Sequence, residues 1–289
     1  MPNPLIKVSP SLILSTAKRV PTSARMYARM QKALRDPNCD LNQIIELVRL
    51  DTGLSAGVIQ ISNNAANKRG ETISTIEDAI NRVGLREVQR LVGLTVSKQM
   101  FSRSLPLYRV GTEALWQNSL CVAVAASCLA QYVDQDEKIG YTIGMMRPIG
   151  RLILQEIANA SHNPFLSSVP ENATYANTHD WEMATFGTTE EAVMSVVLTE
   201  WGFLPQICDT LEFYFRPAQD PHQLVMTALL HVACWTADSL GKGLACERQS
   251  WTLTDDIINQ AGLSSTIIET SAVQTSGAIA EVLQTYHRP

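Results

Sequence analysis

The sequence of 289 residues lacks the features that mark membrane proteins, secreted proteins and disulfide-rich proteins. No uninterrupted apolar stretch reaches the ~18 residues that a membrane-spanning helix needs. The N-terminal segment does not show the basic and then apolar pattern of a signal peptide. The six cysteines include no CxxC pair, which argues against a disulfide framework and against a zinc site. We therefore predict a cytoplasmic protein with reduced, buried thiols and no membrane partner.

Histidine is also scarce. The five histidines include no HxH, HxxxH or HExxH spacing, so a hydrolase whose metal is held by histidines would lack ligands. Only 18% of the residues are charged and 45% are hydrophobic, which predicts a chain that mostly folds. The histidine pattern argues against an enzyme before any motif is considered.

The charges are distributed unevenly, although the net charge is only −5. Residues 1–110 contain 16 Lys and Arg against 8 Asp and Glu, whereas residues 111–289 contain 7 against 20. A basic half could contact nucleic acid, or the two halves could dock on each other. We favour docking, because the basic residues alternate with apolar ones at helical spacing and aromatic residues are few among them.

Apolar residues recur at helical spacing along nearly the whole chain, and strand-like alternation is scarce. The pattern predicts an all-α protein, a bundle of roughly a dozen helices. A break at residues 102–111 divides a basic subdomain (1–110) from an acidic one (111–289), although the two could form one continuous domain. Residues 159–180 are predicted to form a long polar loop. The predicted helices cover residues 23–35, 41–48, 54–61, 76–83, 85–101, 112–133, 137–158, 189–201, 205–215, 222–240, 254–261 and 265–286.

Five segments occur in an order that resembles one known family. They are RVPTSARMYARM (19–30), LDTGLSAGVIQISNNA (50–65), STIEDAINRVG (74–84), LWQNS (115–119) and WGFLP (201–205). Together they resemble the HDOD domain (HD-related output domain) of bacterial signalling proteins, from about residue 15 to at least residue 240. The resemblance implies a relationship to HD-superfamily phosphohydrolases. In those enzymes, histidines and a His-Asp pair hold divalent metals, and a metal-bound hydroxide attacks phosphorus.

The implied metal positions carry unsuitable residues in this sequence. The turn Gly-Leu-Leu-His-Asp-Ile-Gly of the phosphohydrolases is matched by GMMRPIG (144–150), which places Arg147 and Pro148 at the two ligand positions. A guanidinium is always charged and has no acceptor, and proline has no side-chain donor atom. Only Asp238 keeps a ligand-type residue. The other implied positions hold Asn118, Glu190, Tyr214 and Phe215. We therefore predict that the metal site is lost and that no cofactor is bound.

Arg147 has two interpretations. It could form a structural ion pair with Glu190 or Asp238 in the former metal cavity, or it could bind a phosphate of a nucleotide ligand. We favour the ion pair, because a buried charge needs a partner. The dipeptide His179-Asp180 falls in the predicted polar loop, and we interpret it as coincidental. His231 and Asp238 could share a helix face, with His231 a core residue.

The favoured function is a non-catalytic signal-transduction module that binds an unidentified signalling protein. The first alternative is a metal-dependent phosphohydrolase, for example a cyclic-nucleotide phosphodiesterase, with a rebuilt site. The second is nucleic-acid binding by the basic N-terminal half, which salt-dependent binding to DNA would reveal. A homodimer is left open, because the apolar stripe of residues 265–286 could either seal the core or pair with a second copy.

Overall fold

The computed structural model describes residues 3–19, 41–49, 55–59, 62–63, 74–84, 88, 92, 95, 102–171 and 173–286. Within these ranges all regular structure is helical, apart from one isolated bridge between Leu105 and Val110. The all-α prediction is confirmed, with twelve α-helices among the described residues. The predicted helices 23–35 and most of 85–101 lie outside the described residues. Within the described part of the chain, no helix is long and apolar enough to cross a membrane.

The chain divides into two compact units. The first comprises Met1–Arg19 and Phe101–Ile279, and the second comprises Val20–Met100 and Ala280–Pro289. The sequence placed a boundary near residue 110, but Leu105–Val110 belongs to the first unit. The reason is that Leu105, Tyr108 and Val110 are all buried there. The N-terminal segment also belongs to the first unit, through backbone hydrogen bonds from Leu5, Ile6 and Val8 to carbonyls of residues 184–186.

Two of the described helices lie in the second unit. They are α3 (Leu41–Arg49) and α5 (Ile76–Val83), and the latter begins at Thr75, whose side chain accepts from the backbone N–H of Asp78. The first unit contains α1 (Pro10–Ala17), α7 (Thr112–Tyr132), α8 (Glu137–Met146), α9 (Ile149–Ser161), α10 (Tyr175–Phe186), α11 (Glu190–Glu200), α12 (Pro205–Phe213), α13 (Val225–Ser239) and α14 (Asp255–Gln260). The last helix, α15 (Ser265–Tyr286), starts in the first unit and has the predicted bounds.

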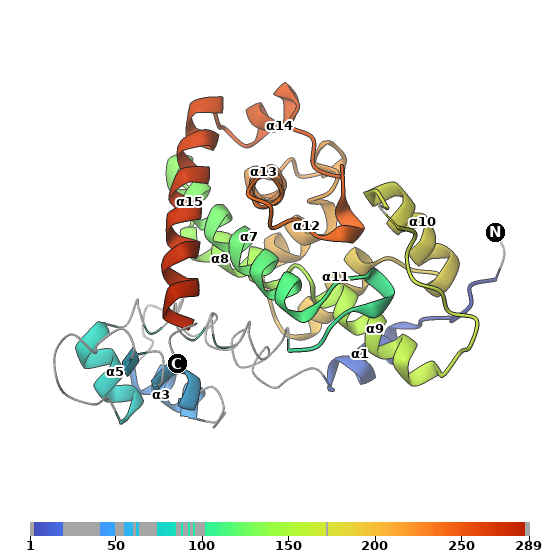
Figure 1. Ribbon diagram of the computed structural model, residues 1–289, viewed down its shortest axis with the longest axis horizontal. Helices are drawn as coiled ribbons and strands as arrows, with labels where there is room; N and C mark the ends of the chain where they lie inside the picture. Colours follow the sequence, from blue (N-terminus) through green and yellow to red (C-terminus); the bar gives the residue numbers. More distant parts are fainter. Residues whose placement is uncertain are drawn as a thin grey trace. The chain divides into compact units, whose positions relative to one another are not determined.

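Helix α7 is the central element of the first unit, as its apolar composition predicted. It packs against α8 and α13 (Figure 1), and most of its middle residues are buried. The approach of α8 depends on small residues. A Cβ added at Gly144 would lie 2.5 Å from the Cα of Ala123, and one at Gly140 would lie 2.7 Å from the carbonyl oxygen of Ala126. Glycines therefore set the distance between the two helices.

The predicted helical stretch 137–158 is two helices. Helix α8 ends before Arg147, and α9 begins after Pro148. Proline has no N–H to donate to the preceding turn, and its ring clashes with the carbonyl four residues earlier, so the helix stops there. The corner places Arg147 between two buried helices.

The prediction of a loop over residues 159–180 is wrong at its C-terminal end. Helix α10 begins at Tyr175, after Thr174, whose side chain forms a capping box with Asn177. The residues that α10 buries include Thr178, Glu182 and Thr185, which are polar. A helix whose buried side carries polar residues shows no apolar stripe, and the periodicity therefore missed it. His179 and Asp180 lie on this helix and not in a loop.

Candidate functional site

Two close backbone contacts hold the corner between α8 and α9 against neighbouring helices. Gly144 allows α8 to reach α7, and Gly150 does the same for α9 and α11. A Cβ added at Gly150 would lie only 2.0 Å from the carbonyl oxygen of Glu190. These contacts give a physical reason for the two glycines that flank the Arg147-Pro148 dipeptide. They also bring the side chains of the corner close to α11.

Arg147 is completely buried and is neutralised by Glu247. Its Nη1 donates to Oε1 of Glu247 at 2.5 Å, and Nη2 donates to Oδ1 of Asn118. Glu247 ends the short 3₁₀ turn η3 (Ala245–Glu247). Asn118, on α7, uses its amide group to donate to the carbonyl oxygen of Lys242 at 2.7 Å. Arg147 thus binds α7 and the segment 242–247 at once.

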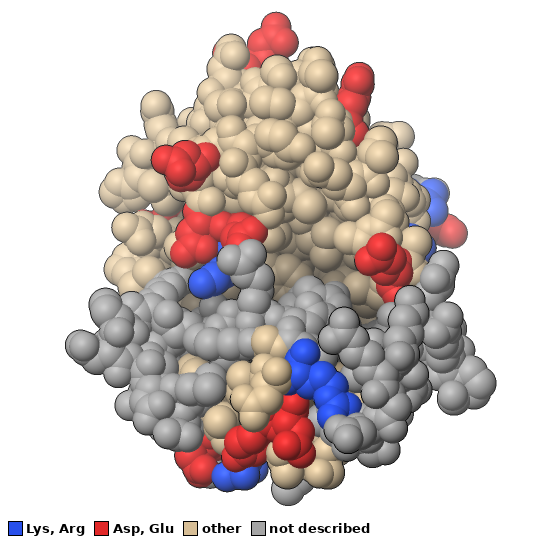
Figure 2. Space-filling view, turned by 90° about the vertical axis from the view of Figure 1, so that its left-hand side faces the viewer, with Lys and Arg blue, Asp and Glu red and all other residues tan. Residues whose placement is uncertain are grey.

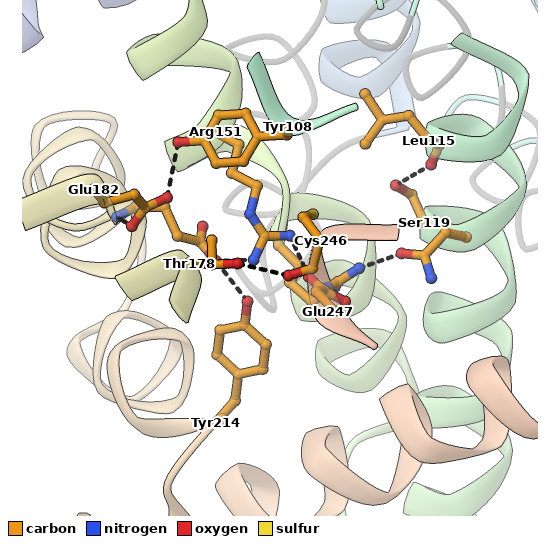
Figure 3. Close-up of polar contacts among 12 residues, drawn as sticks. Tyr108, Leu115, Ser119, Arg151, Thr178, Glu182, Tyr214, Cys246 and Glu247 are labelled. Carbon is orange, nitrogen blue, oxygen red and sulfur yellow. Dashed lines mark hydrogen bonds and ion pairs between the residues drawn. The ribbon is translucent and has the colours of Figure 1, made fainter. Parts of the chain in front are cut away.

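Arg151, one turn later on α9, shares Glu247 and adds Glu190. It donates to Oε1 of Glu247, and its Nη2 lies 3.1 Å from Oε1 of Glu190, at the start of α11. The hydroxyl of Tyr214 donates to the same oxygen of Glu190 at 2.8 Å. Figure 3 shows Arg151, Glu247 and Tyr214 converging from different elements of the first unit. We call the set Arg147, Arg151, Glu190 and Glu247 the buried ion network.

A third carboxylate, Glu182, extends the network by accepting two hydrogen bonds. Oε1 of Glu182 accepts from the hydroxyl of Tyr108 at 2.8 Å, and Oε2 accepts from the backbone N–H of Glu190 at 2.9 Å. Beside it, the hydroxyl of Thr178 donates to the carbonyl oxygen of Cys246 at 2.7 Å (Figure 3). These bonds attach α10 to α11 and to η3. The polar buried side of α10 is therefore explained by its position against the network.

Aromatic rings flank both guanidiniums. The Cζ atom of Arg147 lies 5.9 Å from the centroid of the Tyr214 ring, and that of Arg151 lies 5.8 Å from the Phe215 ring. The Tyr108 ring lies 5.7 Å from the Cζ of Arg151. Distances below about 6 Å allow a cation–π attraction. Tyr214 and Phe215 occupy positions where the resemblance implies metal ligands. In this structure their rings lie beside arginine cations.

The electrostatics of the network follow from its burial. Burial acts to lower the pKa of Arg147, but Glu247 together with Cys234 and Tyr214 more than offsets it, so the pKa lies above its ordinary value. Burial tends to raise the pKa of Glu247, and the two arginines reverse this and lower it. Burial raises the pKa of Glu190 to about 7 despite the charge of Arg151. Burial and the charge of Glu190 raise the pKa of Glu182 well above its usual range.

The residues of this site do not fit a metal ion. Two of the positions implied for metal ligands hold Asn118 and Glu190. Arg147 already donates to Asn118, and Arg151 already pairs with Glu190. The guanidinium of Arg147 has no acceptor atom and repels a cation. Across the described ranges, no group of three or more His, Cys, Asp or Glu side chains is arranged to hold a metal ion. The hydrogen bonds and ion pairs of this site can fix the positions of six elements of the first unit relative to one another.

The structure places most of the predicted site residues together. Arg147 and Glu190 belong to the network. The side chains of Asn118, Tyr214 and Phe215 contact it, and Pro148 lies in the adjoining corner. The exception is Asp238: it is exposed and does not pair with Arg147. It lines a separate cavity with Arg109 and Arg248. The expected partner of Arg147 was Glu190 or Asp238, whereas the structure supplies Glu247.

His231 is a buried core residue in the structure. Its Nδ1 lies 3.0 Å from the carbonyl oxygen of Tyr214, and its Nε2 lies 3.1 Å from that of Thr252. The ring also packs edge-on against Trp251, at 5.2 Å between centroids. Burial lowers the pKa of His231, although the two carbonyl contacts oppose the shift. The histidine joins the end of α12 to the segment before α14.

Sequence reasoning missed four members of the site: Tyr108, Arg151, Glu182 and Glu247. One signal was available for Arg151, which lies four residues after Arg147 and so falls on the same side of the corner. Nothing in the local sequence marks Glu247, because it lies in an irregular segment far from Arg147 along the chain. Its role depends entirely on tertiary structure.

Comparison with known proteins agrees with this fold. The family model described as the HDOD domain matches residues 20–217, which is more than half of the chain. The chain therefore belongs to the HDOD domain family. A search of curated proteins finds no match.

Two solved structures share the fold. An HDOD domain protein of unknown function from Geobacter sulfurreducens has 18% sequence identity and a TM-score of 0.63, covering 93% of this chain and 95% of that chain. A "Putative phosphohydrolase" from Shewanella amazonensis SB2B has 18% identity and a TM-score of 0.60, covering 92% and 94%. At this identity the likeness concerns the fold alone.

Proposed function

We propose that this chain is a non-catalytic signal-transduction module that acts by binding another protein. The observation that carries the proposal is the burial of Arg147 and Arg151 against Glu247 and Glu190. Arg147 stands at a position where the resemblance to HD-superfamily enzymes implies a metal ligand, and carboxylates of this chain neutralise both Arg147 and Arg151. The side chains that would have to bind a catalytic metal instead stabilise the geometry of the helices.

The network supports a structural role, because it joins elements that are distant along the chain. Glu247 binds both arginines, and Asn118 links Arg147 to the carbonyl of Lys242. A buried ion pair of this kind contributes little net free energy compared with an apolar core, but it specifies one arrangement. A signalling module needs a defined surface. The buried ion network preserves such a surface without catalysing a reaction.

Two exposed apolar side chains, on segments joined through one asparagine, support binding of a protein partner. The side chain of Phe165 is 79% exposed and that of Leu5 is 48% exposed. Asn163 connects them, because its side chain donates to the carbonyl of Leu5 and accepts from the backbone N–H of Phe165. Exposed aromatic residues on ordered segments are typical of protein interfaces.

The binding half of the proposal is tested by affinity capture with the purified chain. Any captured protein is then purified and titrated against wild type, Phe165→Ala and the control Val273→Ala, which removes an exposed side chain from α15. We expect a dissociation constant in the micromolar range or below, and a loss of about tenfold for Phe165→Ala only. Equal affinity of all three proteins would contradict a partner surface at Phe165.

The phosphohydrolase alternative is tested by hydrolysis. Purified chain is incubated with bis(p-nitrophenyl) phosphate and with cyclic dinucleotides in the presence of Mn²⁺, Fe²⁺ or Mg²⁺. We expect no turnover above that of the Arg147→Ala variant. Metal-dependent turnover that Arg147→Ala changes would overturn the proposal and establish an enzyme.

Nucleic-acid binding stays a prediction for residues 1–110, many of which lie outside the described residues. Figure 2 shows separate groups of acidic side chains over the described upper surface, with few basic ones among them. That face of the first unit does not attract phosphate backbones. Salt-dependent binding of the chain to duplex DNA would favour this alternative.

A further inference from the structure

A second polar site lies outside the buried ion network. It is a surface cavity of about 300 Å³ lined by the exposed residues Arg109, Asp238 and Arg248 and by Gly241 and Gly243. This volume is at the lower end of the range for small-molecule pockets. The proposed function makes no use of these residues.

Arg109 is held in a fixed orientation at the cavity. Its backbone is left-handed, with φ of 56°, where a non-glycine residue is uncommon. Its Nε donates to the carbonyl oxygen of Val169 at 2.9 Å, which anchors the guanidinium plane. The two terminal nitrogens of a guanidinium carry its other four donors, in the geometry that binds oxyanions.

Helix α7 starts at the same cavity. Its N-cap is Gly111, which has no side chain to accept from the first backbone N–H groups, and Ala114 of the first turn lines the cavity. The 21 residues of α7 align their peptide dipoles with the positive end here. The helix end adds to the positive potential of Arg109 and Arg248, and Glu113 in the first turn offsets only part of it, so the balance favours an anion.

Asp238 adds a negatively charged hydrogen-bond acceptor to the cavity. Its carboxylate packs over Gly243, where an added Cβ would lie 1.9 Å from Oδ1 of Asp238. Glycine at 243 is therefore required for the carboxylate to lie there. A carboxylate beside two arginines would repel a bare dianion, but it accepts a hydrogen bond from a ligand hydroxyl or amine.

We propose that this cavity binds a small phosphomonoester. Its phosphate contacts Arg109, Arg248 and the start of α7, and a hydroxyl or amino group on the ligand donates to Asp238. The site does not depend on the protein-binding role proposed above. Residues 243–245 and 248 line the cavity, while the carbonyl of Lys242 accepts from Asn118 and Glu247 is a member of the network. A bound ligand therefore acts on the segment that the network holds.

The test is isothermal titration of the full chain with ribose 5-phosphate and with inorganic phosphate, in phosphate-free buffer. We expect ribose 5-phosphate to bind with a Kd of about 1 mM or lower, and more tightly than inorganic phosphate. The double variant Arg109→Ala/Arg248→Ala should bind it about tenfold more weakly, and added NaCl should weaken the wild type. Asp238→Ala should abolish the preference for ribose 5-phosphate over inorganic phosphate.

The matched control is Arg103→Ala, which removes an exposed arginine that pairs with Glu156 elsewhere on the first unit. Its affinity should equal that of the wild type. Absence of binding at about 10 mM of both probes would overturn the proposal. So would equal affinity of the double variant and the wild type, or equal affinity of the wild type for the two probes. Intrinsic tryptophan fluorescence verifies that each variant is folded.

Discussion

Replacing Glu247 with glutamine tests how much the buried ion network contributes. The side chain of Glu247 is 1% exposed, and its Oε1 accepts from both Arg147 and Arg151. Glu247→Gln removes the charge and leaves Arg147 with neutral acceptors only, the new amide oxygen and the side chain of Asn118. Removing one member of a buried pair costs about 3–5 kcal/mol. Glutamine keeps one acceptor oxygen, so we expect a loss of about 3 kcal/mol.

The assay is urea unfolding followed by tryptophan fluorescence. All five tryptophans, at positions 116, 181, 201, 235 and 251, lie in the first unit, so the signal reports the unit that contains the network. With a slope of about 3 kcal/mol per molar urea, the midpoint should fall by about 1 M. The control Glu156→Gln breaks an ion pair with Arg103, which is 64% exposed, and should cost less than about 1 kcal/mol.

A double-mutant cycle separates the ion pair from general loss of packing. In the wild type, Arg147→Met leaves Glu247 with one cation fewer. In the Glu247→Gln background, the same change removes a cation that has already lost its charged partner. We therefore expect Arg147→Met to cost about 1–3 kcal/mol less in the second background. If the two costs are equal, or if Glu247→Gln behaves like Glu156→Gln, the network does not stabilise the fold as described.

Three further predictions concern residues around the network. Burial raises the pKa of Glu190 to about 7 from 4.5, so the folded chain binds this proton more tightly than the unfolded chain does. The resulting stabilisation is complete below about pH 4.5 and is lost as the pH rises through about 7. Glu190→Gln should therefore gain stability relative to the wild type between about pH 5 and pH 8 in urea unfolding, and a constant difference would contradict the shift. Gly150→Ala should destabilise the chain by about 1–3 kcal/mol, because its Cβ would meet the carbonyl of Glu190, whereas Gly277→Ala, with open space around it, should stabilise by up to about 1 kcal/mol. Thermal unfolding of the pair measures both, and equal signs would refute the packing argument. Tyr108→Phe leaves Glu182 without the hydroxyl that donates to it and should cost about 1–2 kcal/mol, while Tyr132→Phe at an exposed hydrogen bond should cost almost nothing.

The sequence was sufficient for the fold class, because apolar residues at helical spacing mark most of the helices. The bounds of α15 and the buried character of α7 followed from this spacing alone. Helix α10 was missed because its buried side carries Thr178, Glu182 and Thr185 against a polar interior. Periodicity detects apolar burial and is blind to buried hydrogen-bonded groups.

For the site, the sequence indicated where the changed residues lie but not what they contact. The motif comparison singled out Arg147 and Glu190, and both belong to the network. Glu247 could not be found in this way, because it lies 100 positions after Arg147 in an irregular segment. Asp238 looked like a retained ligand, yet it lies on α13 and lines the other cavity. Pairing between distant polar residues is decided by tertiary structure, which a single sequence does not reveal.

We propose that Arg147 stands in place of a metal ligand of the HD superfamily, and the metal content of the purified chain is the sharpest test of this proposal. The protein is produced with iron, manganese and zinc in the medium, purified without chelators and measured by elemental mass spectrometry. We expect less than about a tenth of an ion per chain, since the guanidinium of Arg147 repels cations. A near-stoichiometric metal that Asn118→Ala or Glu190→Ala releases would contradict it.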